Sequence, residues 1–407
     1  MNDPNSQYWA IAGLAAAVIF GTAGLYRSWI NNRDRRLKTS RELFQETRTY
    51  IKANRSMLQR AALAARDIHP AGLEVLPGVP LLTRNGWIAA TPIPIDSVEL
   101  SKITAYFPRI HVLKGLLPLK EVGRYSKLSD AIIALDKPKK FVDLRQYRLL
   151  EITSGRLVFA DKPSSYFDKI NYGEALVYKY AIDVRQKPMF ATPLRPVPLT
   201  SLPRGHVTLS GVSTLTLLIS GDGLRFIFHL RGREETAYAM GTFHAIPAGE
   251  FQPSSRAPIS WDDDFSLWTN IMREYSEEIM LMEEHDGDSV RAFDYKREPF
   301  NALAQARVDG HLKVFYFGVG LDPISLQAEI LTVAVFRESI FNSIFGKVRS
   351  ENAEGKIVTD AERWGRPFTA KEVNSYMGDA ANTLASGQAL LNLSWKHRDV
   401  LENCIPH

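Results

Sequence analysis

The chain begins with a long stretch of apolar positions. Residues 4–26 carry no charged side chain, and Arg27, Arg33, Arg35, Arg36 and Lys38 follow. A helix of about 20 apolar residues spans a bilayer, so residues 1–31 are predicted to be a transmembrane anchor, with residues 8–30 in lipid. Positive flanks stay cytoplasmic, which places the N-terminus outside and the rest of a single-pass cell-membrane protein in the cytoplasm. A signal peptide lacks support because no basic residue precedes the apolar core; a buried core helix is the other alternative.

The next segment, residues 32–70, has the pattern of a basic amphipathic helix that ends at Pro70. Apolar positions recur every seven residues, at Leu37, Phe44, Ile51, Leu58 and Ala65. This stripe predicts a helix that packs either on its own domain or in a coiled coil. The basic row Arg41, Arg48 and Arg55 could face anionic lipid headgroups. Small residues spaced four apart at Gly13, Ala17 and Gly21 permit a homodimer.

Residues 71–200 form a mixed α/β accessory region whose role the residues do not reveal. Two short strands are predicted around Ser154-Gly155, within "YRLLEITSGRLVFAD". The run "EALVYKYAIDV" fits a strand or a short helix. Four prolines between residues 193 and 203 mark an extended connector, and the domain boundary is placed near residue 200.

Strand-like alternation dominates the first part of residues 201–407. Two apolar runs are joined by Gly221-Asp222-Gly223, a strong hairpin signal. A further strand runs into a turn at residues 247–249, and a helix is predicted from Trp261 to Met282 with an acidic N-terminus at residues 262–264. Thr369 with Glu372 forms a capping-box pattern that predicts the start of a C-terminal helix.

Composition narrows the class of protein. The chain has 407 residues, 45% hydrophobic residues and a net charge of +5. These values fit a globular protein with no expected nucleic-acid partner. Cys404 is the single cysteine, so the chain has no internal disulfide and suits a reducing compartment.

The stretch "REYSEEIM" carries the candidate chemistry. Glu274, Glu277 and Glu278 share one side of a helix, where close carboxylates repel one another unless a divalent cation compensates. Arg273 could orient one carboxylate through a forked hydrogen bond. The alternative is a solvated acidic face on a helix packed through Trp268 and Tyr275.

The order of strand, "PAG" and a helix bearing Arg-Glu-x-x-Glu-Glu resembles the box of Nudix hydrolases. The resemblance covers residues 206–401 and predicts a Nudix-like domain over residues 201–407, with later strands at residues 310–321 and 326–336. It implies an α/β/α sandwich with a mixed sheet, a Mg²⁺ or Mn²⁺ cofactor, and hydrolysis of a nucleoside diphosphate linked to another group.

Carried over by position, the resemblance assigns Glu274 and Arg273 to catalysis and Gly249, Glu274, Glu277 and Glu278 to the metal. Glu329 is a candidate late carboxylate on a facing strand. No phosphate-binding residue is assigned, although Arg225, Arg231 and Arg233 are candidates that are also ordinary surface arginines. His229 and His244 lie in apolar runs and are expected in the core.

The box also departs from the family pattern. Ser255 stands where the family has a loop glutamate, Met280 replaces a glycine, and the interval from Gly249 to Arg273 is longer. Asp262, Asp263 or Asp264 could replace the missing carboxylate. Two functions follow: a membrane-anchored Nudix-type hydrolase acting on a nucleotide-type small molecule, or a sensor that binds a nucleotide without cleaving it.

Overall fold

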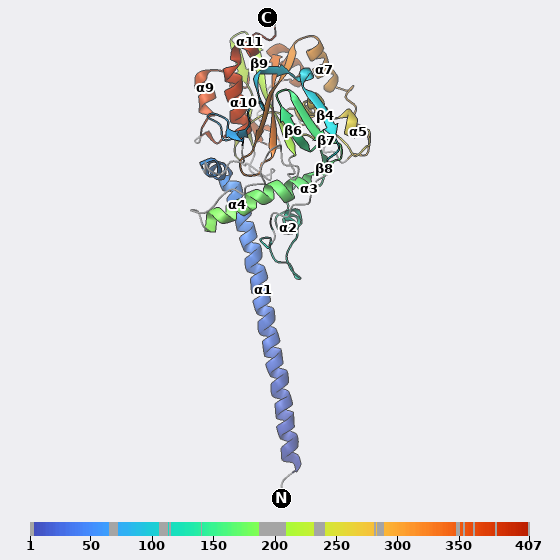
Figure 1. Cartoon of the computed structure of the whole chain (residues 1–407), viewed down its shortest axis with the longest axis vertical. Helices are drawn as coiled ribbons and strands as arrows, with labels where there is room; N and C mark the ends of the chain where they lie inside the picture. The colour runs from blue at the N-terminus through green and yellow to red at the C-terminus, as the bar shows by residue number, and fades with distance from the viewer. Residues whose placement is uncertain are drawn as a thin grey trace.

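A computed structural model shows a mixed α/β protein, which confirms the predicted class (Figure 1). Of helix α1 before residue 31, only the backbone is described. The described residues are 4–64, 72–105, 113, 115–139, 141–186, 209–231, 241–280, 282, 289–346, 351–352, 355–360, 363–378 and 381–405.

A nine-stranded mixed sheet forms the centre of the molecule. Its main path runs β1-β2-β14-β15-β9-β10-β20, while β3 also pairs with β14 and β13 with β9. β9 and β15 are parallel and the other pairs are antiparallel, so the sheet is mixed. The strands are β1 (Glu74–Val75), β2 (Leu82–Thr83), β3 (Ile88–Pro94), β9 (Ser210–Ser220), β10 (Gly223–Phe226), β13 (Ala248–Glu250), β14 (Leu312–Leu321), β15 (Ala328–Arg337) and β20 (Arg366–Pro367).

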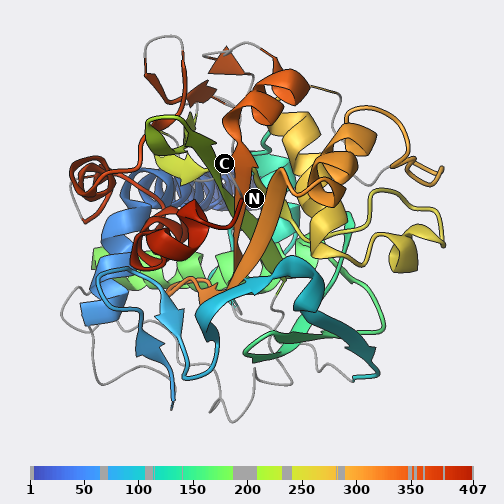
Figure 2. The ribbon, with the colours of Figure 1, turned by 90° about the horizontal axis from the view of Figure 1, so that it is seen from above.

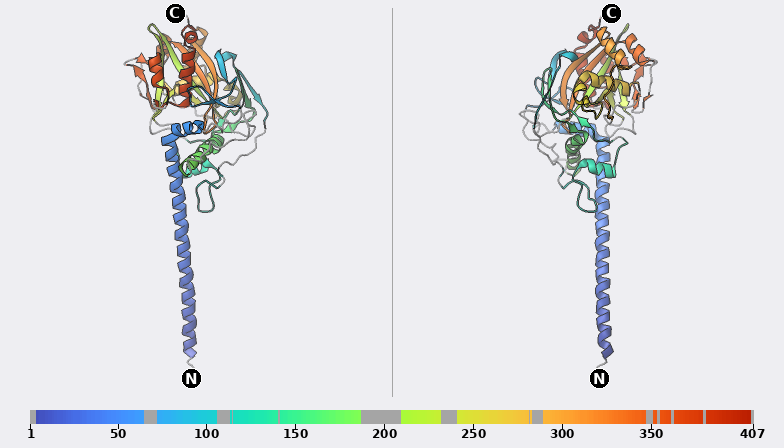
Figure 3. Two further views of the ribbon diagram at one scale, coloured as in Figure 1. Left: turned by 60° about the vertical axis from the view of Figure 1, so that its left-hand side comes forward. Right: turned by 90° about the vertical axis from the view of Figure 1, so that its right-hand side faces the viewer.

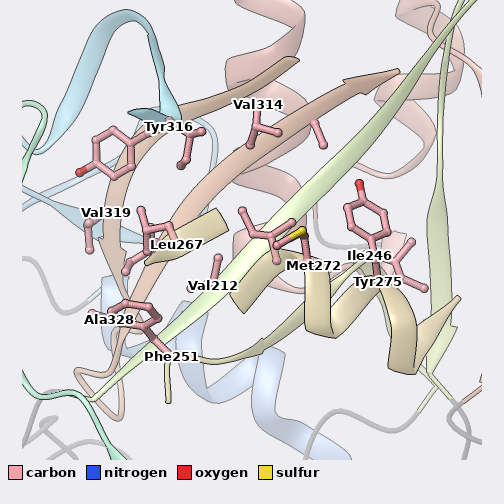
Figure 4. Packing of buried hydrophobic residues seen from close by; sticks show 14 of the residues in the cluster. Val212, Ile246, Phe251, Leu267, Met272, Tyr275, Val314, Tyr316, Val319 and Ala328 are labelled. Atoms are coloured by element: carbon pink, nitrogen blue, oxygen red, sulfur yellow. The ribbon is translucent and has the colours of Figure 1, made fainter. Parts of the chain in front are cut away.

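Helices cover both faces of this sheet (Figures 1 and 2). α6 (Leu267–Glu278), α7 (Phe300–Val308) and α8 (Glu338–Phe345) lie on one face. α9 (Ala370–Ser375), α10 (Ala385–Lys396) and α11 (Arg398–Glu402) lie on the other. Side chains alternate along a strand: Val212 and Leu218 of β9 join the α6 side, and Leu215 and Leu217 join the α10 side. Figure 4 shows Met272 of α6 near Val212 and Tyr275 beside Ile246.

Smaller sheets and helices surround the central sheet. The predicted strand pair around Ser154-Gly155 is confirmed as β6 and β7, and "EALVYKYAIDV" is part of helix α4. The smaller strands are β4 (Glu99–Ile103), β5 (Arg145–Gln146), β6 (Leu149–Thr153), β7 (Arg156–Ala160), β8 (Ser164–Ser165), β11 (Phe228–Arg231), β12 (Phe243–Ala245), β16 (Glu351–Asn352), β17 (Gly355–Ile357), β18 (Thr359–Asp360) and β19 (Arg363–Trp364). The remaining helices are α2 (Leu128–Leu135), α3 (Tyr166–Lys169), a π-helical turn (Ile170–Glu174), α4 (Ala175–Gln186) and α5 (Ser260–Asp263), with a 3₁₀ turn at Ile95–Ser97.

Helix α1 (Pro4–Ala64) runs from the N-terminus into the folded part and bends at Asn54 (Figures 1 and 3). Phe44, Ile51 and Leu58 are buried in a cluster with residues of α2 and α4, which confirms packing of this helix on its own domain. The lipid-facing position considered for Arg48 and Arg55 is wrong. Both side chains turn inward. Arg48 forms an ion pair with Asp136 at the end of α2, and Arg55 forms one with Glu174 of the π-helical turn.

Membrane insertion stays a prediction. Across the described parts of the chain, no helix is both long and apolar enough to cross a bilayer. The side chains of residues 8–30, which carry the prediction, lie outside the described residues.

Two predicted boundaries differ from the structure. The single helix predicted from Trp261 to Met282 is two helices, α5 and α6. The second begins at Leu267, because Ser266 caps it by accepting a hydrogen bond from the Thr269 amide at 3.4 Å. β1, β2 and β3 belong to the accessory region by sequence and still join the central sheet. The boundary placed near residue 200 falls outside the described residues.

Phe44→Ala should destabilise the protein because it leaves a cavity between α1 and α4, where Phe44 is 1% exposed and its ring lies 5.5 Å from that of Tyr178. We expect a loss of about 3–5 kcal/mol in unfolding free energy, measured by denaturant titration. Leu43→Ala is the matched control, since its side chain is 44% exposed; equal losses in both variants would contradict the packing described for α1.

Candidate functional site

Helix α6 brings two of the predicted glutamates against β13. Tyr275 anchors the helix, because its ring is buried and its hydroxyl lies 2.7 Å from the Thr216 hydroxyl of β9. A Cβ placed on Gly249 would come within 2.1 Å of the Glu274 carboxyl carbon, so only glycine admits this approach. Glu278 accepts hydrogen bonds from the Ala248 amide at 3.2 and 3.3 Å. Glu274, Glu278 and Gly249 therefore lie together as predicted.

Glu277 and Glu278 occupy different environments although they are adjacent. Glu278 is 7% exposed and faces β13, whereas Glu277 is partly exposed. Apolar side chains on the same helix, such as Ile271 and Met272, fix this orientation because they fill the interior against the sheet. The solvated acidic face considered from the sequence therefore does not describe Glu278.

Arg273 lies in the interior, 2% exposed. It donates hydrogen bonds to the Tyr295 hydroxyl at 2.7 Å and to the Gln252 carbonyl at 2.6 Å, and its guanidinium lies 3.5 Å from the Asp264 carboxylate. Burial lowers the pKa of Arg273, but Tyr295, Asp264 and Glu274 raise it, and the net shift is upward. The hydrogen bonds of this guanidinium thus tie α6 to the loop before it, through Gln252, and to the segment after it, through Tyr295.

The loop before α6 is organised by Asp264. Its carboxylate accepts hydrogen bonds from the Ser254 amide at 2.7 Å, the Ser254 hydroxyl at 2.6 Å and the Tyr295 hydroxyl at 2.5 Å. Asp262 is exposed and lies 2.8 Å from the Lys102 ammonium. Ser255, at the position of the family's loop glutamate, is buried with its hydroxyl 2.6 Å from that of Ser260. Asp264 is therefore a structural carboxylate of the loop.

The structure places Glu329 on the opposite face of the sheet from Glu274. Glu329 pairs with Gly211, and Gly211 pairs with Glu250. Directly paired residues share a face, whereas Gly249 is one position away and faces α6. The two faces separate Glu329 from the helix that carries the box.

Glu329 belongs to a second polar cluster that the sequence did not predict. It accepts a hydrogen bond from the Ser213 hydroxyl at 2.9 Å, and Lys169 of α3 forms an ion pair with the neighbouring Glu250. Burial raises the pKa of Glu329 to about 7, while Lys169 lowers it and Glu250 raises it. No local pattern marks Lys169, because its role depends on α3 packing against the end of β13.

The histidine and arginine candidates from the sequence lie in the protein interior where the structure describes their side chains. His229 and His244 are 3% and 6% exposed, which confirms both as core residues, and His244 lies 2.9 Å from the Ser386 hydroxyl. Arg225 is buried and donates to the carbonyls of Trp364 and Gly365 at 3.1 and 2.9 Å. The side chain of Arg231 and all of Arg233 lie outside the described residues.

The carboxylates near Gly249 are the candidate ligands for the predicted Mg²⁺ or Mn²⁺. Two carboxylates, Glu274 and Glu278, lie against the strand that holds Gly249. Within the described ranges, no group of three or more His, Cys, Asp or Glu side chains could hold a metal ion. The Mg²⁺ or Mn²⁺ binding that the Nudix resemblance implies stays a prediction.

Comparison with known proteins adds no relative. No protein-family model matches the chain, and no curated protein matches its sequence. The Nudix resemblance thus rests on the residues of the box and on the order of strands and helices around it.

Asp264→Asn should destabilise the protein, because it removes the charge that faces buried Arg273 and weakens the anchor of Ser254. Breaking a buried pair in this way costs about 3–5 kcal/mol. Thermal and denaturant unfolding measure the effect. Asp263→Asn is the control on an exposed neighbour and should change stability by less than ~0.5 kcal/mol; an Asp264→Asn variant as stable as this control would contradict the anchoring role.

Glu329 should make stability depend on pH. Its folded pKa of about 7 exceeds the ordinary value of 4.5, so the folded state binds the extra proton and the associated stability is lost as pH rises from about 4.5 through 7. The shift corresponds to up to ~3 kcal/mol. Relative to wild type, Glu329→Gln should therefore gain stability between pH 5 and pH 8, as measured by melting temperature; parallel pH profiles of the two proteins would refute the assignment.

Proposed function

We propose that the chain is a membrane-anchored sensor whose Nudix-like domain, residues 201–407, binds a nucleotide-type small molecule without hydrolysing it. The observation that carries this proposal is the use of the box residues for structure. Arg273 ties α6 to Asp264 and Tyr295, and Glu278 holds the Ala248 amide. Charged groups that hold the fold together in this way are less available for catalysis, while the fold that the resemblance associates with nucleotide binding is kept.

The arrangement of the layers is compatible with the α/β/α sandwich that the resemblance implies. A mixed sheet lies between two sets of helices, and α6 follows β13 along the chain and packs against it. The resemblance to Nudix hydrolases is the reason for proposing a nucleotide as the ligand.

A buried polar link supports signalling toward the anchor. Arg55 of α1 lies 3.2 Å from Glu174 of the π-helical turn and 3.8 Å from Asp322, in the connection between β14 and β15. Gln59 of α1 donates to the same Asp322 carboxylate at 2.5 Å. A shift of the central sheet would thus act directly on the helix that continues into the predicted membrane segment.

Hydrolysis is the second candidate function. It is favoured by the placement of Glu274 against Gly249 and of Glu278 beside Ala248, which matches the positions that the Nudix resemblance assigns to the metal and the base. Such an activity would require Mg²⁺ or Mn²⁺ and should be lost in Glu278→Gln.

A single experiment on the full chain distinguishes nucleotide binding from hydrolysis. The whole chain is required because Phe44 and Leu58 of α1 belong to the packed interior. The purified protein is heated with a panel of nucleoside phosphates and nucleoside diphosphate derivatives, with and without Mg²⁺ or Mn²⁺, and each mixture is analysed by chromatography. A ligand at a hundred times its Kd should stabilise the fold by about 2.7 kcal/mol, seen as a higher melting temperature, with no product.

Glu278→Gln in parallel separates the outcomes. Metal-dependent products from wild type that are absent from the variant would replace the sensor proposal with hydrolysis. A melting temperature unaffected by every nucleotide tested, in protein shown to be folded, would overturn nucleotide binding itself.

A further inference from the structure

A surface made by α1, α2 and a loop lies at the end of the folded part from which α1 emerges. A loop over residues 115–127 extends from this end alongside α1, toward the N-terminus (Figures 1 and 3). The loop is attached to the helix, since the Leu119 amide donates to the Ser40 hydroxyl at 3.0 Å. Gln45 also donates to the Leu135 carbonyl at the end of α2, at 2.8 Å. α1, α2 and the loop therefore present one continuous surface.

This surface carries an excess of positive charge. Residues 33–45 of α1 contain five cationic side chains and two acidic ones, Asp34 and Glu42. Residues 115–127 add three cationic side chains and one acidic one, Glu121. A juxtamembrane concentration of this kind attracts anionic headgroups, at about fivefold in binding for each Lys or Arg near the surface.

A cavity of about 530 Å³ lies between α1 and α2 on this surface. Lys38 and Arg41 line it together with Asp34 and Glu42, and Leu37 contributes an apolar wall. The Arg41 Nε–H is buried without a hydrogen-bond partner among the described residues. A phosphate group entering the cavity would supply the missing acceptor, because guanidinium groups favour phosphate oxygens.

The tip of the loop is apolar and exposed. Val122 is 84% exposed, and Lys120 and Arg124 flank it. An apolar residue between two cations suits the boundary between headgroups and acyl chains.

We propose that this surface, formed by residues 33–45 of α1, the 115–127 loop and the end of α2, docks on an anionic phospholipid bilayer. Ser40 lies ten residues beyond residue 30, or about 15 Å along the helix axis. The headgroup layer reaches about 5–7 Å past the hydrocarbon, and charges act over about 8–10 Å more. The inference rests on the predicted anchor and is independent of nucleotide binding.

The test places a fluorescent reporter at the loop tip of the full chain. Val122→Cys is combined with Cys404→Ser and labelled with an environment-sensitive dye, then reconstituted into vesicles of phosphatidylcholine alone or with one third phosphatidylglycerol. Emission should shift to the blue, and brominated lipid should quench it, in the anionic vesicles. High salt should reverse both effects, because it shortens the screening length to about 3 Å at 1 M.

Matched variants keep the result interpretable. Val308→Cys, at a site that is 79% exposed on α7, should show no difference between the two lipids. The double variant Lys38→Gln, Arg41→Gln should reduce the ratio of membrane-docked to free loop tip by more than about tenfold. The single variant Lys38→Gln is the control for misfolding of the double variant. Equal emission from the Val122 dye in both lipids, or failure of the chain to float with either vesicle, would overturn the proposal.

Discussion

The parallel pairing of β9 with β15 is the constraint on which the rest of the structure depends. Ten residue pairs, from Ser210 with Ala328 to Ile219 with Arg337, hold two strands far apart in sequence in one register. Because side chains alternate along both strands, that register assigns every residue to one of two faces. One face receives α6 and the other receives α10, and a slip of one residue would exchange their partners.

The same register separates two polar sites. On the α6 face, Gly249 admits the Glu274 carboxylate, and Glu278 holds the neighbouring amide. On the other face, Glu329 lies with Ser213 and near the ion pair of Lys169 and Glu250. The second site joins the accessory region to the sheet. Burial there raises the pKa of Glu329. It is a structural junction that ties three parts of the chain together.

Helix α1 connects the folded part to the predicted membrane segment. Its apolar stripe packs on α4, and its arginines at positions 48 and 55 form ion pairs within the fold. The helix is thus part of the domain and would carry a displacement of the sheet toward the bilayer. The cationic surface where it leaves the fold would set the distance between the domain and the lipid.

The sequence by itself determined the local elements. An apolar run predicted β9, Gly221-Asp222-Gly223 predicted the hairpin, and the seven-residue stripe predicted the buried face of α1. The Nudix resemblance supplied β14 and β15 and placed Glu274 and Glu278 beside Gly249. Tertiary structure alone decided the inward pairing of Arg273 with Tyr295 and the placement of Glu329 on the opposite face of the sheet. These features depend on which residues meet across long separations, and sheet register and the choice of hydrogen-bond partner leave no periodic trace in the chain.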